Sequence, residues 1–302
     1  MSRILITGAS GFIGSNLAAY LQKKNHDIIG WDRQLNNQAF YSEEIDLSDD
    51  NGVVKAIENC KPDIIIHCAG SADVRKSVLN PHDDFMGNVV ITHNLLFALH
   101  KLEMNHTRFV FLSSAGVYGN PQELPIRESA LLKPLSPYAL HKEMCEKSCE
   151  YFHENYNMDI KIARIFSAYG TGLKKQIFWD MYCKYMANGR LNMFGTGKES
   201  RDYIFIDDVV KSLELIAKSD SDDFIFNVAS GKETTIREAT ELFADILGES
   251  RDIISFNNVV REGDPINWRA DISRIENLGF SPTIELKDGL AKYVDWLKRT
   301  IG

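Results

Sequence analysis

The sequence has no long hydrophobic run. None of its 302 residues falls in a stretch that approaches the roughly 18 apolar residues of a membrane-spanning helix, so such a helix is not expected. The opening residues MSRILITG have neither the apolar core nor the cleavage site of a secretory signal. We therefore interpret them as the first strand of a core and expect a cytoplasmic protein.

An excess of basic residues is also missing. The formal net charge is −8, so no global basic surface for nucleic acid or for a membrane is expected. The five cysteines are an odd number without the paired spacing of a zinc site, and we expect free thiols and no metal ion. With 44% hydrophobic and 25% charged residues, the composition predicts one large α/β unit or two closely joined domains.

Apolar runs alternate with helix-like stretches through the first half of the chain. The runs lie at 4–6, 28–31, 64–67, 109–112 and 160–165, and the helical stretches at 12–24, 49–59, 84–103 and 137–156. This alternation predicts right-handed β-α-β units and a doubly wound parallel sheet covered on both faces. Glycine-rich breaks then change the pattern. They predict a first domain over 1–166 and a smaller second domain over 167–302, with segments near 201–230 returning to the sheet.

Three glycines, Gly8, Gly11 and Gly14, connect the first strand to the first helix. Glycines permit a tight turn and let the backbone approach a pyrophosphate, while a helix N-terminus offers unpaired N–H groups and a partial positive charge. The order of strand, glycine turn and helix therefore predicts a dinucleotide site. Its spacing, G-x-x-G-x-x-G, differs from the more familiar G-x-G-x-x-G.

Asp32 supports this prediction, because it lies 18 residues beyond Gly14 at the end of the second apolar run. A carboxylate there can accept both ribose hydroxyls of NAD and would repel the 2′-phosphate of NADP. Arg33 beside it could serve a 2′-phosphate. NAD is therefore the preferred cofactor, and NADP stays open as an alternative.

Tyr138 and Lys142 lie four residues apart in an expected helix, so their side chains project from one face. The strand before them ends in Ser113 and Ser114, at the carboxyl edge where such sheets bind ligands. A free tyrosine has a pKa of ~10, and lowering it to near 7 requires about 4 kcal/mol. A nearby ammonium and the positive ring of a nicotinamide would together favour the phenolate, which makes tyrosine a usable base.

Together these motifs resemble the extended short-chain dehydrogenase/reductase family, specifically its NAD-dependent sugar-nucleotide epimerases and dehydratases. The resemblance covers nearly the whole chain and implies a Rossmann-type sheet with a smaller nucleotide-sugar-binding domain after it. It rests on the following segments, which occur in the family's order: TGASGFIG at 7–14, Asp46-Leu47, HCAG at 67–70, Asn88, SSAGVYG at 113–119, Arg164-Ile-Phe, GTGKESRDYIFIDD at 195–208, REGD at 261–264 and Asp271-Ile-Ser.

The resemblance implies a role for each matching residue. Ser114 would hydrogen-bond the sugar O4, Tyr138 would be the acid/base, and Lys142 would bind the nicotinamide ribose and lower the tyrosine's pKa. The implied cofactor residues are Gly8, Gly11, Phe12, Ile13, Gly14, Asp32, Arg33, Asp46, Leu47, Cys68, Ala69, Gly70, Asn88, Ser113, Tyr138 and Lys142. The implied substrate residues are Ser77, Ser114, Ser167, Asn192, Phe194, Arg201, Arg261 and Asp264.

Some of these residues have a simpler interpretation. Arg201 and Arg261 would contact the nucleotide diphosphate, but an ion pair between domains would also explain them. Asn192 and Phe194 match positions that hold the nucleobase, and a short core strand accounts for them nearly as well. His67 is expected to be a satisfied structural histidine, and His141 is expected on the helix surface.

The residues after Ser114 bear on the reaction. In the family's 4,6-dehydratases the next two positions are Asp and Glu, because eliminating water needs an extra acid and base. Here they are Ala115 and Gly116, which disfavours dehydration, and the missing glutamate also argues against decarboxylation. What remains resembles the UDP-hexose 4-epimerases, which oxidise C4 transiently to a 4-keto sugar.

Three features depart from that pattern: Ser167 replaces a usual asparagine, Gly116 replaces a usual threonine, and the chain is short for a UDP-galactose 4-epimerase. They keep a second hypothesis open, an NAD(P)H-dependent reductase of a nucleotide-linked 4-keto-6-deoxy sugar. A third is a catalytically silent NAD(P)-binding sensor. The resemblance also implies a homodimer, formed through the helices expected at 84–103 and 137–156.

Overall fold

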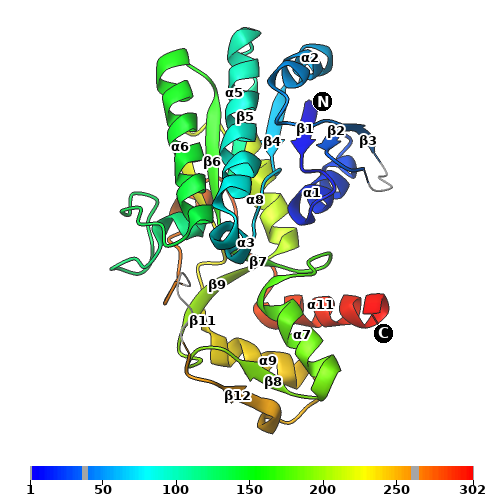
Figure 1. Cartoon of the computed structure of the whole chain (residues 1–302), viewed down its shortest axis with the longest axis vertical. Coiled ribbons are helices and arrows are strands. Elements are labelled where there is room, and N and C mark those ends of the chain that lie inside the picture. The colour runs from blue at the N-terminus through cyan, green and yellow to red at the C-terminus, as the bar shows by residue number, and fades with distance from the viewer. Residues whose placement is uncertain (1, 36–39, 260–264, 302) are drawn as a thin grey trace.

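The computed structural model describes residues 2–35, 40–259 and 265–301. Within these residues, the upper part in Figure 1 holds a seven-stranded sheet of order β10-β6-β5-β4-β1-β2-β3, in which every neighbouring pair is parallel. Its strands are β1 (Arg3–Thr7), β2 (Asp27–Asp32), β3 (Tyr41–Glu44), β4 (Ile64–His67), β5 (Arg108–Ser114), β6 (Ile160–Ile165) and β10 (Ile225–Val228).

Helices cover both faces of this sheet. One layer contains α1 (Phe12–Gln22) and α8 (Ile206–Lys218), and the other contains α2 (Asp50–Cys60), α5 (Ile91–Lys101) and α6 (Pro137–Tyr156). Within β1, Ile4 and Ile6 pack into the first layer and Leu5 into the second. Because both faces are buried, the strands read as continuous apolar runs. The predicted doubly wound, Rossmann-type sheet is thus confirmed.

The order of the strands creates a crevice at one edge of the sheet. From β1 the chain winds outward through β2 and β3, and then returns to the other side of β1 with β4. The connections leave β1 and β4 in opposite directions, so their carboxyl ends form a switch point where such sheets bind ligands. Gly8 follows β1 and Gly70 follows β4, which places both predicted cofactor segments at this point.

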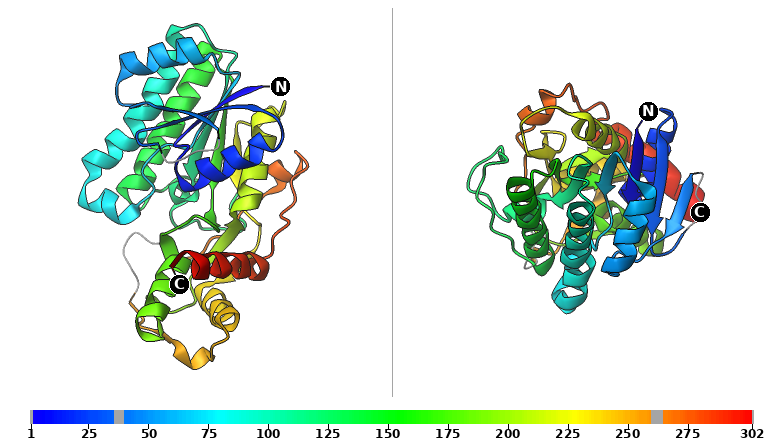
Figure 2. Two further views of the ribbon diagram at one scale, coloured as in Figure 1. Left: turned by 90° about the vertical axis from the view of Figure 1, so that its right-hand side faces the viewer. Right: turned by 90° about the horizontal axis from the view of Figure 1, so that it is seen from above.

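The lower part of Figure 1 contains smaller sheets, of order β11-β9-β7 and β12-β8. Helix α11 packs against α9 and β9 and lies below the parallel sheet (Figure 2). We propose two domains with a boundary near residue 166. From the second half of the chain, α8 and β10 return to the upper domain. The other elements after residue 166 are β7 (Ser167–Tyr169), α7 (Gln176–Asn188), β8 (Leu191–Met193), β9 (Ser200–Phe205), β11 (Glu233–Thr235), α9 (Ile236–Leu247), a 3₁₀ turn (Arg251–Ile253), β12 (Ile254–Phe256), α10 (Ser273–Glu276) and α11 (Leu286–Ile301).

The helix expected over 84–103 is interrupted. After α3 (Val74–Leu79) the chain forms α4 (Pro81–Phe85), then a π-helical turn (Met86–Val90), and only then α5. A π turn holds one extra residue and changes which side chains face inward, and it often occurs at functional sites. Here it buries Asn88.

Glu214 on α8 holds α1 in place. Its carboxylate accepts hydrogen bonds from the Tyr20 hydroxyl at 2.7 Å, from Lys24 Nζ, and from Lys218 Nζ at 2.7 Å. Burial raises the pKa of Glu214, but these donors outweigh it and lower the pKa to about 2. The carboxylate is therefore ionised at neutral pH and fixes the helix that follows the glycine turn.

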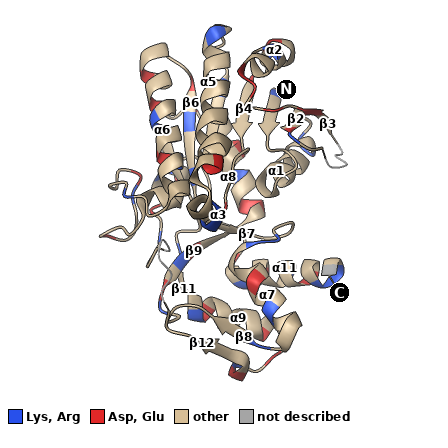
Figure 3. Ribbon diagram, viewed as in Figure 1, with Lys and Arg blue, Asp and Glu red and all other residues tan. Residues whose placement is uncertain are grey.

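Charged side chains of both signs are scattered over the two parts in the view of Figure 3. Among the described residues, no helix is long and apolar enough to cross a membrane. The same residues contain no cluster of His, Cys, Asp and Glu side chains arranged to hold a metal ion.

Candidate active site

A cavity of about 1050 Å³ lies between the upper and lower parts. The upper part contributes the glycine turn and the carboxyl ends of β4 and β5, and the lower part contributes β7, the start of α7 and segments on either side of β9. The predicted residues that line it are Gly8, Gly11, Phe12, Ile13, Gly14, Cys68, Gly70, Ser113, Ser114, Tyr138, Lys142, Ser167, Phe194 and Arg201.

The glycine turn is packed too tightly for any larger residue. Gly8 has φ +67°, and a Cβ on it would lie 2.6 Å from the Ala69 nitrogen. A Cβ on Gly14 would lie 2.2 Å from the Gly8 oxygen. Helix α1 begins at Phe12, and its N-cap residue, Gly11, provides no side-chain cap, nor does the first turn contain an acid. Its positive end is therefore open to an anion, which fits the pyrophosphate of a dinucleotide.

Asp32 is fixed beside this turn. Its Oδ2 accepts a hydrogen bond from the Ser10 backbone N–H at 2.9 Å, and its Oδ1 accepts one from the Arg33 backbone N–H at 2.8 Å. Because backbone donors orient it, the carboxylate is preorganised to receive ribose hydroxyls. The Arg33 side chain is exposed at the same edge.

Asp46 and Leu47 follow β3 and differ in burial. The exposed Asp46 accepts two hydrogen bonds from Ser48, at 2.9 Å from the amide and 2.8 Å from the hydroxyl, and these bonds lower the pKa of its carboxyl. Leu47 is buried in the core, and its carbonyl accepts a hydrogen bond from Asn94 Nδ2 at 2.9 Å. Among the described residues that line the large cavity, neither of the two appears. A contact between these residues and the adenine of a dinucleotide is implied only by the resemblance.

Ser114, Tyr138 and Lys142 come together at the end of β5. Ser114 is the last residue of the strand, and its hydroxyl accepts a hydrogen bond from the Gly116 N–H at 3.1 Å. Tyr138 lies in the first turn of α6, where its side chain hydrogen-bonds Ser114. Lys142 is buried one turn later, and its Nζ donates to the Leu112 carbonyl at 3.0 Å. The three side chains predicted from the sequence thus form one cluster in the cavity wall.

Burial controls the acidity of this cluster. It raises the pKa of Tyr138 to about 12, although the hydrogen bond with Ser114 opposes it. Burial also lowers the pKa of Lys142, against the influence of neighbouring acids. The lowering of the Tyr138 pKa by Lys142, implied by the resemblance for a site that holds the cofactor, stays a prediction.

Gly70 and Asn88 lie behind Lys142. The Asn88 amide nitrogen donates to the Asp84 carbonyl at 3.0 Å, and its buried Oδ1 has no partner among the described residues. A Cβ on Gly70 would lie 2.7 Å from that oxygen and 3.5 Å from Lys142 Nζ. Glycine therefore lets the backbone after β4 pass close to the π-helical turn and to α6.

The lower part supplies the other wall. Arg201 Nη1 donates to the Ser200 carbonyl at 2.7 Å and to the Ile266 carbonyl at 3.3 Å, and its guanidinium lies 5.6 Å from the ring centroid of Trp268. Ser167, at the start of β7, is half-buried in the same wall. Phe194 is exposed, with Lys184 Nζ 5.4 Å from its ring centroid.

Some predicted substrate residues lie elsewhere in the part of the chain that is described. Ser77 is fully buried, where its hydroxyl donates to the Val74 carbonyl at 2.7 Å and accepts from the Tyr138 N–H at 3.1 Å. Asn192 is exposed, and its Oδ1 accepts from the Ser255 hydroxyl at 2.7 Å beside a smaller cavity of about 420 Å³. Arg261 and Asp264 lie outside the described residues.

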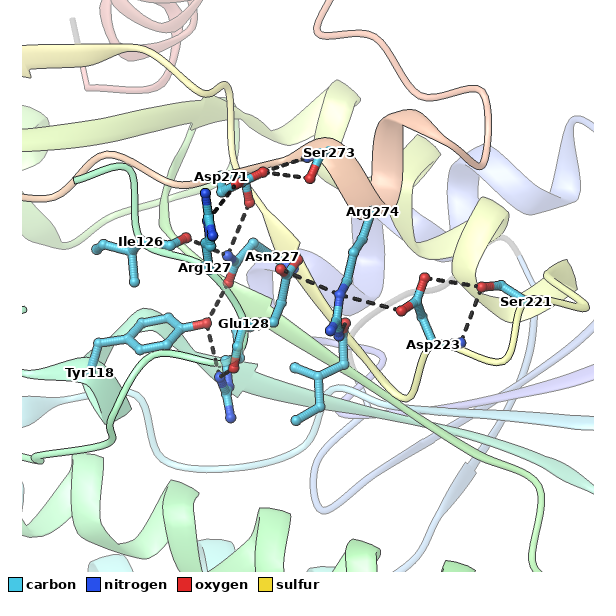
Figure 4. A network of polar contacts seen from close by, with 12 residues as sticks. Tyr118, Ile126, Arg127, Glu128, Ser221, Asp223, Asn227, Asp271, Ser273 and Arg274 are labelled. Atoms are coloured by element: carbon cyan, nitrogen blue, oxygen red, sulfur yellow. Dashed lines mark hydrogen bonds and ion pairs between the residues drawn. The ribbon is translucent and has the colours of Figure 1, made fainter. Parts of the chain in front are cut away.

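A buried polar network fixes the 3₁₀ turn (Ala115–Tyr118) that follows Ser114. The Tyr118 hydroxyl donates to Asn227 Oδ1 at 2.7 Å, and the Asn227 N–H donates to Glu128 Oε1 at 2.9 Å. Asn227 Nδ2 donates to the Asp271 carbonyl at 3.0 Å. Figure 4 shows these residues joining the turn, β10 and the C-terminal segment. The network thus holds the carboxyl end of β5 close to the segment that carries Trp268.

The environment predicted from the sequence is correct for His67 but not for His141. His67 is a satisfied structural residue as predicted, with Nδ1 2.7 Å from Thr7 Oγ1 and Nε2 3.1 Å from Thr92 Oγ1. The prediction that His141 lies on the helix surface is wrong. It is buried against Asp84, because α4 covers this face of α6.

Sequence reasoning missed two aromatic residues of the cavity wall. Trp268 is 9% exposed, and its Nε1 donates to the Gly119 carbonyl at 3.0 Å. Tyr203 is buried, with a hydroxyl that has no partner among the described residues. Tyr203 belongs to a segment that carried the resemblance, whereas Trp268 had no signal that distinguished it from an ordinary core residue.

A family model matches residues 4–229, and its description is the NAD dependent epimerase/dehydratase family. The UDP-glucose 4-epimerase of Mycolicibacterium smegmatis is 31% identical over 315 residues, which covers 98% of each chain.

Two solved structures extend the similarity to the fold. The UDP-glucuronic acid 4-epimerase of Bacillus cereus, in complex with UDP-glucuronic acid and NAD, has a TM-score of 0.88 and 27% identity, and the match covers 98% of this chain and 99% of that one. A dTDP-glucose 4,6-dehydratase of Streptomyces venezuelae with NAD bound has a TM-score of 0.90 and 25% identity, with 99% and 97% covered. Relatives of both reaction types therefore share this fold.

Proposed function

The chain belongs to the NAD dependent epimerase/dehydratase family, and we propose that it is an NAD-dependent UDP-hexose 4-epimerase. The observation that carries the proposal is the cluster of Ser114, Tyr138 and Lys142 in the wall of the cavity, next to two positions without an acid. The cluster supplies acid/base chemistry at a sugar hydroxyl. The missing acid removes what elimination of water would need.

The groups that would hold NAD fit its chemistry. The open N-terminus of α1 suits the pyrophosphate, Asp32 suits the adenosine ribose, and buried Lys142 suits the nicotinamide ribose. NAD, when bound, supplies an acceptor and donor of hydride for C4 of the sugar.

The chain's own residues move the proton. Tyr138 takes the proton of the sugar O4 and later returns it, and Ser114 hydrogen-bonds the same oxygen. The 4-keto sugar turns over between the two steps and regains its hydrogen on the other face. Because burial holds the Tyr138 pKa near 12, the base form must be stabilised by charges close to it in the complex.

The carboxylates that line the cavity already have partners of their own, and this disfavours dehydration, which needs an additional acid and base. The described residues that line it include three, Asp73, Asp180 and Glu199. Asp73 accepts from a backbone amide at 3.0 Å, Asp180 pairs with a lysine at 2.7 Å, and Glu199 accepts from a backbone amide at 3.0 Å. Each is held by partners of its own, and Gly116 presents no side chain beside Ser114.

Proton NMR tests the proposal. The purified protein is incubated with UDP-glucose, UDP-N-acetylglucosamine and UDP-glucuronate in separate samples without added cofactor. We expect one of them to convert to its C4 epimer, because the bound NAD is regenerated in every cycle. A folded protein that converts none of the three, but oxidises added NADH in the presence of a nucleotide-linked 4-keto-6-deoxy sugar, is the reductase instead.

We also propose a homodimer through α5 and α6. Leu140, Met144 and Tyr151 are exposed apolar residues on α6, and burying them against a second copy would remove this surface from water. Met144→Glu should convert the dimer to a monomer in sedimentation experiments, whereas Met186→Glu, at an exposed methionine of α7, should not. A wild-type protein that sediments as a monomer contradicts the proposal.

A further inference from the structure

A buried pair of ionisable side chains lies behind the catalytic residues and has no part in the reaction proposed above. His141 Nδ1 is 2.7 Å from Asp84 Oδ2, and the two side chains are 9% and 2% exposed. His141 lies on α6 between Tyr138 and Lys142, and Asp84 lies on α4. The Phe85 ring packs edge-on against the imidazole, with ring centroids 5.5 Å apart.

The Asp84 carboxylate has more capacity to accept hydrogen bonds than its partner uses. His141 occupies Oδ2, while Oδ1 is buried without a hydrogen-bond partner among the described residues. An unpaired oxygen of a buried carboxylate is destabilising, so this arrangement calls for an explanation other than fold stability.

The charge of Asp84 reaches both catalytic residues. Burial raises the pKa of Tyr138, and Asp84 raises it further. Burial lowers the pKa of Lys142, and Asp84 is one of the acids that oppose this. Negative charge on the Asp84 carboxylate thus favours the ammonium of the lysine and disfavours the phenolate of the tyrosine.

The ionisable groups around Asp84 lie on the elements that pack against α4. Helix α4 packs against α3, the π-helical turn and α6. The π-helical turn carries no ionisable side chain, and those of α3 are exposed. The groups to consider are therefore Arg75 and Lys76 on α3, and Tyr138, His141, Lys142 and Cys145 on α6.

We propose that Asp84, held in place by His141, is a positioning residue that keeps Lys142 charged and opposes ionisation of Tyr138. Its value for turnover rests on the proposed function, whereas its effect on Tyr138 does not. Replacing the carboxylate by a neutral group of the same shape should therefore make Tyr138 a stronger acid.

Asp84→Asn is the test, because the amide has the same shape and can still bond His141. Asp83→Asn is the matched control, since it removes the same charge from the adjacent, exposed position. His141→Asn keeps the carboxylate and offers it a neutral N–H donor. Asp84→Ser is a second neutral variant if the first does not fold.

The primary readout is carbon-13 NMR of protein labelled at the tyrosine ring carbon that bears the hydroxyl, with NAD bound and no substrate. The Tyr138 signal is assigned by its loss in Tyr138→Phe, and it is titrated with pH in each variant. We expect Tyr138 to ionise about one pH unit lower in Asp84→Asn, which is a roughly tenfold rise in the ratio of phenolate to phenol. The acid limb of kcat should move by the same amount.

Three results would overturn the proposal. They are equal titration curves for Asp84→Asn and wild type, an equal shift in Asp83→Asn, or an equal downward shift in His141→Asn, since that variant keeps the negative charge. If no UDP-sugar is epimerised, the proposed function fails but the NMR titration still tests the role of Asp84.

Discussion

Replacement of Tyr138 by phenylalanine should abolish turnover and leave the fold intact. The substitution removes one hydroxyl, whose hydrogen bond goes to Ser114, and keeps the ring. The backbone N–H of residue 138 still donates to the Ser77 hydroxyl, and Ser114 still accepts from the Gly116 N–H. Loss of one hydrogen bond lowers the free energy of unfolding by about 1 kcal/mol.

The loss of catalysis should be much larger. A positioned acid/base contributes about 10²- to 10⁴-fold, equivalent to roughly 3 to 5 kcal/mol of transition-state stabilisation. NMR of the UDP-sugar measures the rate, thermal unfolding measures stability, and the absorbance of released dinucleotide measures bound NAD. Tyr41→Phe is the control, because this exposed tyrosine on β3 bonds only Glu43 among the described residues. A Tyr138→Phe rate within tenfold of wild type would refute the assigned role.

Three further predictions concern neighbouring features. Ser114→Ala should reduce kcat about tenfold and move its acid limb to higher pH, because Ser114 lowers the pKa of Tyr138; an unmoved limb in the pH profile would contradict this. Gly14→Ala should abolish NAD binding in calorimetry, since its Cβ would lie 2.2 Å from a turn carbonyl, whereas Gly87→Ala, with nothing within 4 Å, should bind normally. The carboxyl of Glu214 has its folded pKa lowered to about 2, so its stabilisation is present above the unfolded pKa of about 4.5 and is lost as pH falls towards 2. Glu214→Gln should flatten that part of the acid-unfolding curve.

The sequence predicted the buried elements well because burial controls their pattern. The runs at 64–67 and 160–165 match β4 and β6, and the helix predicted at 137–156 matches α6. The glycine turn was predictable for a related reason, since only glycine permits its close backbone contacts. The cluster of Ser114, Tyr138 and Lys142 followed from strand direction and helical spacing.

The features that the sequence did not predict depend on tertiary contacts. Strand β3 (Tyr41–Glu44) is a polar edge strand, so only one side of its backbone is paired and no apolar run marks it. No pattern in the sequence marked the π-helical turn, which buries Asn88. His141 was expected at the surface because helical spacing cannot reveal that α4 covers it, and Trp268 reaches the cavity from a segment distant in sequence.

The most direct test of the central claim follows the hydrogen at C4. The UDP-sugar that the protein converts is prepared with deuterium at C4 and incubated in ordinary water, and in a second sample the unlabelled sugar is incubated in heavy water. If C4 is oxidised and then reduced by the same hydride, the epimer retains its deuterium in the first sample and gains none in the second. Loss of the label to water, or uptake of deuterium at C4, would contradict transient oxidation at this carbon.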